Sequence, residues 1–557
     1  MKKALIIILV LCLLTGGGFF AYQAGLVDKL LGLFGLGIYH PLPSQNDSSH
    51  VHTIVIDPAV SPTCDRSGLT EGQHCSECGE ILVLQQEIPF LGHQYVNNIC
   101  TLCGGDDHTD YLVFKLLEDD TYMVLGISQE NYPVHLVIPS TYLGKSVTTV
   151  SGYAFLYYTE LLSVSIPDSV TSVITIGPIY SPEDEFPPAI EEENDIIYLD
   201  RWALASKEES TTYTLRPGTV GVAGAIAGNS KITDVTIPKS VKYLHSTYFT
   251  TIKTEVDIDF IDMIETTYVC SLNSITVEEG NPVYYSKGNC VIDRESNTLL
   301  IGSNNSVIPQ GITGIGDYAF AGCRNLASIT IPDSVTNIGK GAFQDCRNLN
   351  SITIPNSVTE LGESAFYNCC NARSITLSEQ LLTIPKQAFA NCKFATSITF
   401  GENSKVTTIK AYAFYSCKGV ITFTIPKSVE SISSVPTPYA LKSITVEEGN
   451  KRYRSVDNCL IDTKNKSLIL GCKNSIIPTD GSITTIAHAA FSECEGLKSI
   501  IIPKSVKSIG LGAFYNCSNL ADIYYTGSMA DWDKITTEGL TNELRRATIH
   551  YNYIPQK

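Results

Sequence analysis

The stretch that decides the fold is LASITIPDSVTNIGKGAFQDC, residues 326–346, and it starts again at Leu349 as LNSITIP. A cysteine recurs with it every 23 residues, at Cys323, Cys346, Cys369 and Cys392. A fixed period of roughly 20 to 29 residues with apolar positions in the order L-x-x-L-x-L is typical of a leucine-rich solenoid. The sequence therefore predicts a repeat solenoid, in which each coil contacts only its neighbours.

The first half of one coil predicts a strand. Ile329 and Ile331 alternate with Ser328 and Thr330. We therefore expect the isoleucines to face inward and the hydroxyls to line the exposed face of a parallel β-sheet built by successive coils. Pro332 is expected to end the strand, because proline has no N–H group to give to the ladder.

The second half of the coil predicts the opposite face. Val335 and Ile338 are expected to cross the interior, and Gly339 to take a backbone conformation that a residue with a side chain resists. Ala342 and Phe343 then open a short helical turn whose ring fills the core. The predicted coil thus has a strand on one face and a short helical turn on the other.

The periodic cysteines fit the same core. Free cysteine is among the residue types most often buried, and its small apolar side chain suits the crowded space behind the helical turn. We expect these thiols to be packed and reduced. Disulfides between coils stay open as an alternative, because strands about 4.8 Å apart lie within the Cα separations that disulfides tolerate.

Less regular copies of the repeat flank the central block, and two insertions share the motif VEEGN, at Val277 and at Val446. We expect a signal peptide or a signal-anchor transmembrane helix at 1–26, a linker at 27–49, a Cys/His knuckle module at 50–105, a cap hairpin with the first coil at 106–160, repeats at 161–525 with β-hairpin insertions at 277–302 and 446–471, and a C-terminal cap at 526–557.

The N-terminus predicts export. Lys2 and Lys3 precede an apolar run from Ala4 to Leu26 that is about long enough to cross a bilayer as a helix. The two lysines place the start in the cytoplasm and direct the rest outward. An uncleaved anchor and a cleaved signal peptide both stay open, since the run has no good small-x-small cleavage site.

A small module between residues 50 and 104 contains the densest group of metal-capable side chains. Two C-x-x-C-G knuckles have the spacing of a zinc ribbon, in which each knuckle presents two thiolates to one tetrahedral ion. A structural zinc ion would let so small a β-rich segment fold, although an exported chain also permits two disulfides. The predicted ligands are Cys75, Cys78, Cys100 and Cys103, with Cys64 and His93 as alternates.

Charge and motifs narrow the function classes. The formal net charge is −18, and no Lys/Arg-rich run follows the extreme N-terminus. Nucleic acid and anionic lipid are therefore poor partners, because both need a basic surface. The sequence has no G-x-S-x-G motif, no metalloprotease helix and no Cys/His arrangement outside the knuckle module. We expect no enzyme activity and no catalytic or cofactor-binding residues.

Partner contact is expected where the period breaks. The exposed strand positions of the central coils repeat Ser and Thr, which predicts a hydroxyl ladder more than a tuned binding surface. The acidic stretch 181–200 interrupts the period and predicts a loop that projects from its coil. It is one candidate for a partner-binding patch.

The repeat SITIPxSVxxIGxxAFxxC resembles the BspA-type leucine-rich repeat family of bacterial and protist surface proteins, from roughly Tyr111 to Tyr553. The resemblance implies a right-handed solenoid at the cell surface and adhesion to host proteins, matrix proteins or other cells. The knuckle segment resembles an accessory module of surface proteins from anaerobic gut bacteria, and that resemblance implies no activity. The alternatives are a passive stalk on the cell surface and, less favoured, an envelope hydrolase.

Overall fold

The computed structural model describes most of the chain from residue 53 onward. The described ranges are 53–63, 67–77, 81–88, 91, 95–96, 99–100, 102, 111–128, 134–152, 154–155, 158–174, 187–206, 211–225, 231–244, 251–256, 264–433, 439–537 and 542–555. The predicted export segment 1–26 lies outside them. Among the helices of the described ranges, none has the length and apolar character needed to cross a membrane.

The chain divides into two compact units. The first comprises Met1–Val55 with Cys75–Cys78, and the second comprises Ile56–His74 with Gly79–Lys557. In the first, the Ser76 N–H donates to the Thr53 carbonyl oxygen at 3.0 Å. The strands of the N-terminal region are β1 (Ile54–Asp57), β2 (Gly68–Leu69), β3 (Gly72–Cys75), β4 (Ile81–Val83), β5 (Glu87–Ile88), β6 (Tyr95–Val96) and β7 (Ile99–Cys100).

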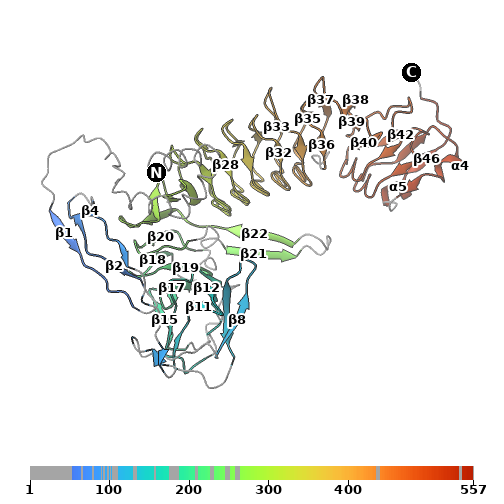
Figure 1. Cartoon of the computed structure of the whole chain (residues 1–557). Coiled ribbons are helices and arrows are strands. Elements are labelled where there is room, and N and C mark those ends of the chain that lie inside the picture. Colours follow the sequence, from blue (N-terminus) through green and yellow to red (C-terminus); the bar gives the residue numbers. More distant parts are fainter. Residues whose placement is uncertain are drawn as a thin grey trace, which may run out of the picture. The chain divides into compact units, whose positions relative to one another are not determined.

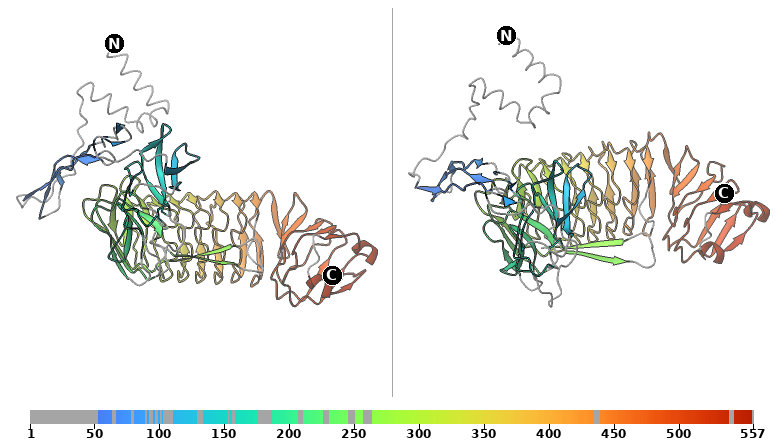
Figure 2. Two further views of the ribbon diagram at one scale, coloured as in Figure 1. Left: turned by 90° about the horizontal axis from the view of Figure 1, so that it is seen from below. Right: turned by 60° about the horizontal axis from the view of Figure 1, so that its bottom comes forward.

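The central coils form a repeat solenoid (Figures 1 and 2). The SIT segments of successive coils pair in parallel and in register, Ser374 with Ser397 and Thr376 with Thr399. Within this ladder the isoleucines are buried and the threonines exposed, as predicted, while Ser374 and Ser397 are half-buried. In the coil used for the prediction, residues 328–331 form no strand and Ile329 is only half-buried. The strands of the ladder are β29 (Ile352–Thr353), β31 (Ser374–Thr376) and β33 (Ser397–Thr399). The following coils pair β35 (Thr422–Ile425) with β37 (Ser443–Val446), and the last coils pair β42 (Ser499–Ile502), β44 (Asp522–Tyr525) and β46 (Thr548–His550).

Each central coil also contributes a second short strand. Ile338 was expected only to cross the interior, yet Asn337 and Ile338 pair in parallel with Gly314 and Ile315 of the preceding coil. A second set of parallel pairs therefore follows the first, in three sheets. They contain β27 (Gly314–Ile315), β28 (Asn337–Ile338) and β30 (Glu360–Leu361); β32 (Thr383–Ile384), β34 (Thr408–Ile409) and β36 (Ser431–Ile432); and β41 (Thr485–Ile486), β43 (Ser508–Ile509) and β45 (Thr536–Thr537).

The segment around Ala342 and Phe343 is a series of hydrogen-bonded turns rather than a helix. The Gln344 N–H donates to the Gly341 carbonyl at 2.9 Å, and the Cys346 N–H donates to the Phe343 carbonyl at 3.2 Å. Two residues of the segment, Gly341 and Asp345, have φ angles of 57° and 60°. This left-handed conformation interrupts a right-handed helix, which explains why the turns do not lengthen.

A column of phenylalanine rings fills the core behind these turns. Phe343 is fully buried, and its ring stacks at 4.9 Å on both Phe320 and Phe366. Phe389 and Phe414 continue the stack at spacings of 5.6 Å. The prediction that this ring fills the core is confirmed.

The periodic cysteines lie beside the column and are buried, as predicted. From Cys346 onward, these thiols donate to the carbonyl of the phenylalanine in the coil before: Cys346 to Phe320 at 3.2 Å and Cys369 to Phe343 at 3.2 Å. Burial raises the pKa of these thiols, to about 12 for Cys417. They are therefore protonated donors near neutral pH.

The coils before the central block are less regular. Two groups of strands make up the first part: β8 (Leu112–Leu116), β9 (Tyr122–Ile127), β11 (Thr141–Tyr142), β12 (Lys145–Ser151) and β14 (Ser172–Ile174) share one sheet, and β10 (His135–Val137) pairs with β13 (Ser163–Ser165). The next part contains β15 (Ile190–Glu193), β16 (Ile196–Leu199), β17 (Trp202–Ser206) and β19 (Gly221–Ala225) in one sheet, β18 (Thr212–Thr214), β20 (Asp234–Ile237) and β23 (Ser274–Val277) in another, and the hairpin of β21 (Thr251–Val256) and β22 (Ile264–Val269).

The two VEEGN insertions have one design. In the first, Asn281 accepts from the N–H groups of Val283 and Tyr284 and donates to the carbonyls of Pro238 and Val241. Asn450 makes the same four bonds in the second. The insertion strands are β24 (Tyr284–Lys287), β25 (Cys290–Asp293) and β26 (Thr298–Ile301), then β38 (Tyr453–Val456), β39 (Cys459–Asp462) and β40 (Ser467–Leu470).

The last coil is followed by two short helices, α4 (Met529–Trp532) and α5 (Asn542–Arg546). Ser528 caps α4 by accepting from the Asp531 N–H, while the Asp531 side chain accepts from the Ser528 N–H, a capping box. The Trp532 ring lies edge-on to Tyr525 at 5.1 Å. Trp532 is partly buried and packs against the core of the last coils.

Candidate functional site

A pocket of about 520 Å³ lies on the irregular coils, where the period breaks. One wall comes from strand β13, another from β15 and the β16–β17 turn, and a third from the turn after β18. It is therefore assembled from segments that are distant in sequence. Its lining residues are Leu162, Ser163, Val164, Ser165, Ala189, Glu191, Asp200, Arg201, Arg216, Pro217 and Gly218.

Arg216 is held in the pocket by several contacts. Its guanidinium donates to the Asp200 carbonyl at 2.6 Å, is ion-paired with Glu191, and lies 4.2 Å from the centre of the Tyr198 ring. The Tyr198 hydroxyl accepts from the Arg216 backbone N–H at 3.0 Å. Because Tyr198 is fully buried, it holds the arginine on a rigid support.

Arg201 is held by a second carboxylate. Its Nη2 donates to Asp168 Oδ1 at 2.6 Å, and Asp168 Oδ2 accepts from the Ser67 N–H at 2.7 Å. Burial would raise the pKa of Asp168, but these two donors outweigh burial and hold the pKa below its usual value. Arg201 Nε is buried without a hydrogen-bond partner among the described residues. The pocket thus holds its charges as fixed pairs with one donor unused.

The rim of the pocket is acidic. The side chains of Glu191 and Glu193 are 58% and 50% exposed, and both approach Arg216. An ionised carboxylate offers about four acceptor positions, so a single ion pair leaves room for another donor. The arrangement can therefore bind a cationic or hydrogen-bond-donating group.

A serine and a histidine meet at the edge of the pocket. Ser163 Oγ and His135 Nδ1 are 2.8 Å apart, on register partners of β13 and β10. A serine nucleophile needs a base that is itself oriented by a third group. No carboxylate is hydrogen-bonded to His135 within the described ranges, so the pair fits an exposed cross-strand contact better than a catalytic dyad.

The acidic stretch 181–200 was expected to project as a loop. Its described part, residues 187–200, is instead the β15–β16 hairpin, in which Glu191 pairs with Tyr198. The hairpin joins a four-stranded sheet with β17 and β19. The stretch nevertheless supplies Ala189, Glu191 and Asp200 to the pocket. Sequence reasoning did not single out Arg201 and Arg216, although two arginines beside an acidic run were a usable signal.

Most of the predicted zinc ligands lie outside the residues that the structure describes. Cys64, Cys78, His93 and Cys103 are not among the described residues, and Cys100 is described only as part of strand β7. Cys75 is buried at the end of β3, next to His74, whose Nδ1 contacts Asp57 at 2.9 Å. No group of three metal-capable side chains occurs where side chains are described. Zinc binding stays a prediction, which metal analysis of the purified chain checks.

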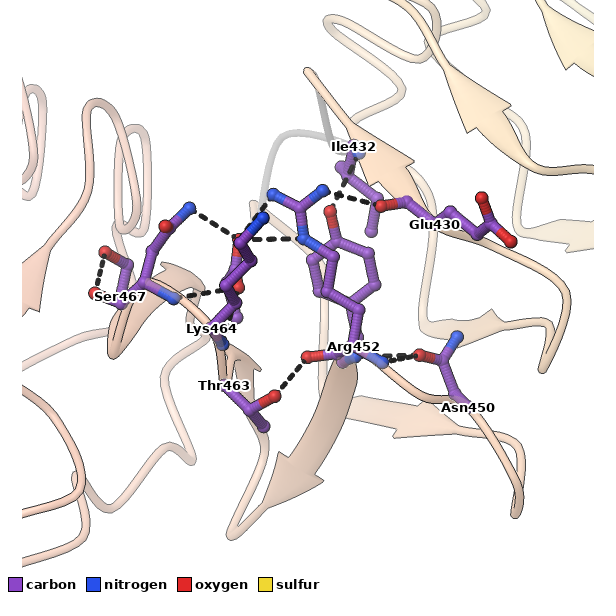
Figure 3. A network of polar contacts seen from close by, with 10 residues as sticks. Glu430, Ile432, Asn450, Arg452, Thr463, Lys464 and Ser467 are labelled. Carbon is purple, nitrogen blue, oxygen red and sulfur yellow. Dashed lines mark hydrogen bonds and ion pairs between the residues drawn. The ribbon is translucent and has the colours of Figure 1, made fainter.

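A second polar cluster lies at the insertion after Val446 (Figure 3). Arg452 donates through Nη2 to Asp462 at 2.9 Å and through Nη1 to the Glu430 carbonyl at 2.7 Å. Asp462 also accepts from the backbone N–H groups of Lys464 and Asn465. Every one of these bonds joins the insertion to itself or to the coil before it. The cluster is therefore a structural lock rather than a binding site.

Solved structures similar to this chain are bacterial leucine-rich repeat proteins. One from Eubacterium ventriosum is 17% identical, with 74% of this chain and 94% of that chain covered and a TM-score of 0.35. A leucine rich cell surface protein from Faecalibacterium prausnitzii is 19% identical, with 77% and 97% covered and a TM-score of 0.25. One from Bacteroides ovatus is 18% identical, with 79% and 98% covered and a TM-score of 0.31.

The comparison with curated proteins gives no significant match. Among family models, the BspA type leucine rich repeat region matches in six copies, over residues 313–436 and 465–549. The matched ranges contain the Phe column, the periodic cysteines from Cys323 to Cys392 and most of the short parallel strands of the regular coils. The repeats of these two ranges therefore belong to the BspA-type leucine-rich repeat family.

Proposed function

We propose that this chain is an exported cell-surface protein that mediates adhesion by binding a protein partner, and that a partner side chain enters the charged pocket. The apolar N-terminal segment supports export. The solenoid supports binding, because stacked repeats build the extended surfaces that repeat proteins use for recognition. If the segment is not cleaved, it also anchors the chain in the membrane.

The observation that carries the proposal is the contrast between two parts of the solenoid. The strand positions of the central coils repeat the same Ser and Thr, exposed or half-buried, so this face offers a partner little that distinguishes one coil from the next. The irregular coils hold the pocket, with Arg216 and Arg201 fixed by buried or paired groups. Fixed charges cost little further ordering when a ligand binds, which favours specificity.

The proposed partner presents a basic or donor side chain. The acidic rim of Glu191 and Glu193 attracts such a group, and the net charge of −18 favours encounter with basic partners. Screening by salt should therefore weaken binding, since these carboxylates are solvent-exposed.

The test is a binding screen of the purified chain against host matrix proteins, followed by Glu191→Gln with Glu193→Gln for any partner found. We expect a loss of affinity of about tenfold or more, with a reduced salt dependence. Glu402→Gln with Glu448→Gln is the matched control, because both glutamates are exposed on other coils. Equal affinity of the two double variants would place the partner elsewhere.

A passive spacer is the competing function. The regular Ser/Thr face favours it, because a spacer needs only length and a soluble surface. A screen that recovers no specific partner for the intact chain, with the chain shown to be folded by circular dichroism, would support the spacer over the adhesin.

A further inference from the structure

Cys270 and Cys323 meet where the irregular coils join the central block. They are partners in an isolated parallel β-bridge, and the Cys270 N–H donates to the Gly322 carbonyl at 2.9 Å. Adjacent strands lie about 4.8 Å apart, inside the Cα range of about 4.4–6.8 Å that disulfides adopt. Cys270 is 5% exposed and Cys323 is fully buried. Both sulfurs therefore lie inside the protein on directly neighbouring backbone segments.

The backbones are clamped together at this bridge. Gly322 has φ of 75°, and a Cβ there would come within 2.6 Å of Tyr268 and 2.8 Å of Cys270 backbone atoms. The Tyr268 N–H donates to Asp345 Oδ2 at 2.9 Å, which holds the end of β22 against the next coil. The two cysteines are thus held in place by contacts that do not involve sulfur.

Cys323 differs from the later cysteines of its column. Cys346, Cys369, Cys392 and Cys417 each donate to a phenylalanine carbonyl of the preceding coil. Cys323 instead has the Cys270 thiol as its partner, which lowers the pKa of Cys270, while that contact and burial raise the pKa of Cys323. In the reduced state Cys323 therefore has a second thiol as its partner, where the later cysteines of the column have a phenylalanine carbonyl.

We propose that Cys270 and Cys323 form an intramolecular disulfide in the exported chain, which staples the end of the β21–β22 hairpin to the first coil of the central block. The oxidant is an external disulfide, either of low molecular weight or in a disulfide oxidoreductase. A thiolate of the pair attacks it and forms a mixed disulfide with release of one thiol; the second cysteine then displaces the other. One disulfide bond breaks, one forms, and two thiols leave.

Burial sets the order of events. The pair is shielded in the folded chain, so the exchange takes place as the chain folds, before Tyr268 and Cys270 are covered. Once formed, the bond is protected from reductants by the same burial. Of the proposed function, this inference uses only export to an oxidising compartment, and ligand binding does not enter it.

The test uses the full chain refolded in a buffer of oxidised and reduced glutathione. Non-reducing digestion and mass spectrometry should recover a linked peptide that contains Cys270 and Cys323. Cys369→Ser is the control and should retain this linked peptide. In Cys270→Ser the linked peptide should be absent and Cys323 should react with a maleimide once the chain is denatured.

A second measurement covers the case in which a serine variant folds poorly. A reductant present throughout the urea titration reaches the bond once the chain unfolds. It should therefore lower the urea midpoint of the wild-type chain and leave that of the Cys270→Ala/Cys323→Ala variant unchanged. The proposal is overturned if both thiols of the refolded wild type can be alkylated once the chain is denatured. It is also overturned if either one is linked to a different cysteine. Because no ligand is used, these outcomes are independent of the adhesion test.

Discussion

At the scale of single residues, the fold depends on side chains that serve two coils at once. Phe343 contacts a ring in the coil before it and a ring in the coil after it, both at 4.9 Å. Arg452 joins Asp462 of its own insertion to the Glu430 carbonyl of the coil before it. Losing such a residue therefore removes contacts in more than one coil.

Phe343→Ala is expected to lower the free energy of unfolding by about 3–5 kcal/mol, because it empties a fully buried site in the ring column. Urea denaturation followed by circular dichroism measures the loss. Phe394→Ala is the matched control, since that ring is 53% exposed and its removal should cost well under half as much. Equal losses would mean that the column does not carry the stability assigned to it.

The Asp462 lock should weaken in acid. Burial alone would raise the pKa of Asp462, but the bonds from Arg452, Asn465 and Lys464 outweigh it and lower that pKa below 3.8. The stabilisation is complete above the unfolded-state pKa, near 4, and is lost as the pH falls through the lower folded-state value. The stability gap between wild type and Asp462→Asn should therefore shrink between about pH 5 and pH 3. A gap that is independent of pH would contradict this role.

At the scale of elements, the sequence predicted the coil well and its second half less well. The SIT strand, the buried phenylalanine and the buried cysteine follow from the period, because each is an apolar position that recurs. The Asn337–Ile338 strand was missed since two residues give no alternation to detect. The turns were expected to be helical. The left-handed residue before each cysteine interrupts them, but it varies among Gly, Asp, Asn, Ser and Glu, so no residue type marks this conformation in the sequence.

Glycine is required at position 339, but the prediction gave the wrong reason for it. No left-handed φ is found there; instead, a Cβ would lie 2.6 Å from the Asp317 nitrogen and 2.7 Å from the Gly316 carbonyl carbon. The neighbouring coil, and not the local backbone, demands glycine.

Gly339→Ala should therefore force two coils apart and destabilise the chain by roughly 1–3 kcal/mol, a typical cost of overpacking. Thermal or urea unfolding measures it. Gly126→Ala is the control, since its nearest contact would be an ordinary 3.7 Å. A neutral Gly339→Ala would show that coil spacing adjusts freely.

At the scale of the whole molecule, stability is distributed among separate cores. One core cluster includes Phe343 and reaches Cys472, and another contains Phe491 and Phe514 with the last coils. In a solenoid each repeat is stabilised by its nearest neighbours. The charged pocket belongs to none of this periodicity, and its residues 163, 191 and 216 are too far apart in sequence for spacing to predict their meeting.

The effect of Phe343→Ala should accordingly stay local. Hydrogen exchange is expected to speed up by tenfold or more in the coils from 314 to 399 and to change little from 485 to 525. Mass spectrometry of peptides from both ranges in one sample provides the internal control. Equal acceleration in both ranges would indicate a single cooperative unit instead.

The bond from each cysteine thiol to a phenylalanine carbonyl of the preceding coil gives the column a direction. Each coil donates one thiol hydrogen bond to the coil before it and accepts one from the coil after it. Adding or removing a whole coil preserves this pattern. A longer coil also preserves it when the extra residues lie outside the Phe–Cys segment: Cys417 follows Cys392 by 25 residues (417−392) instead of 23, and it still donates to the Phe389 carbonyl at 3.2 Å. The chain can therefore change length by whole coils or by loops outside that segment, and the coil at the head of the column is the one whose cysteine needs a different partner.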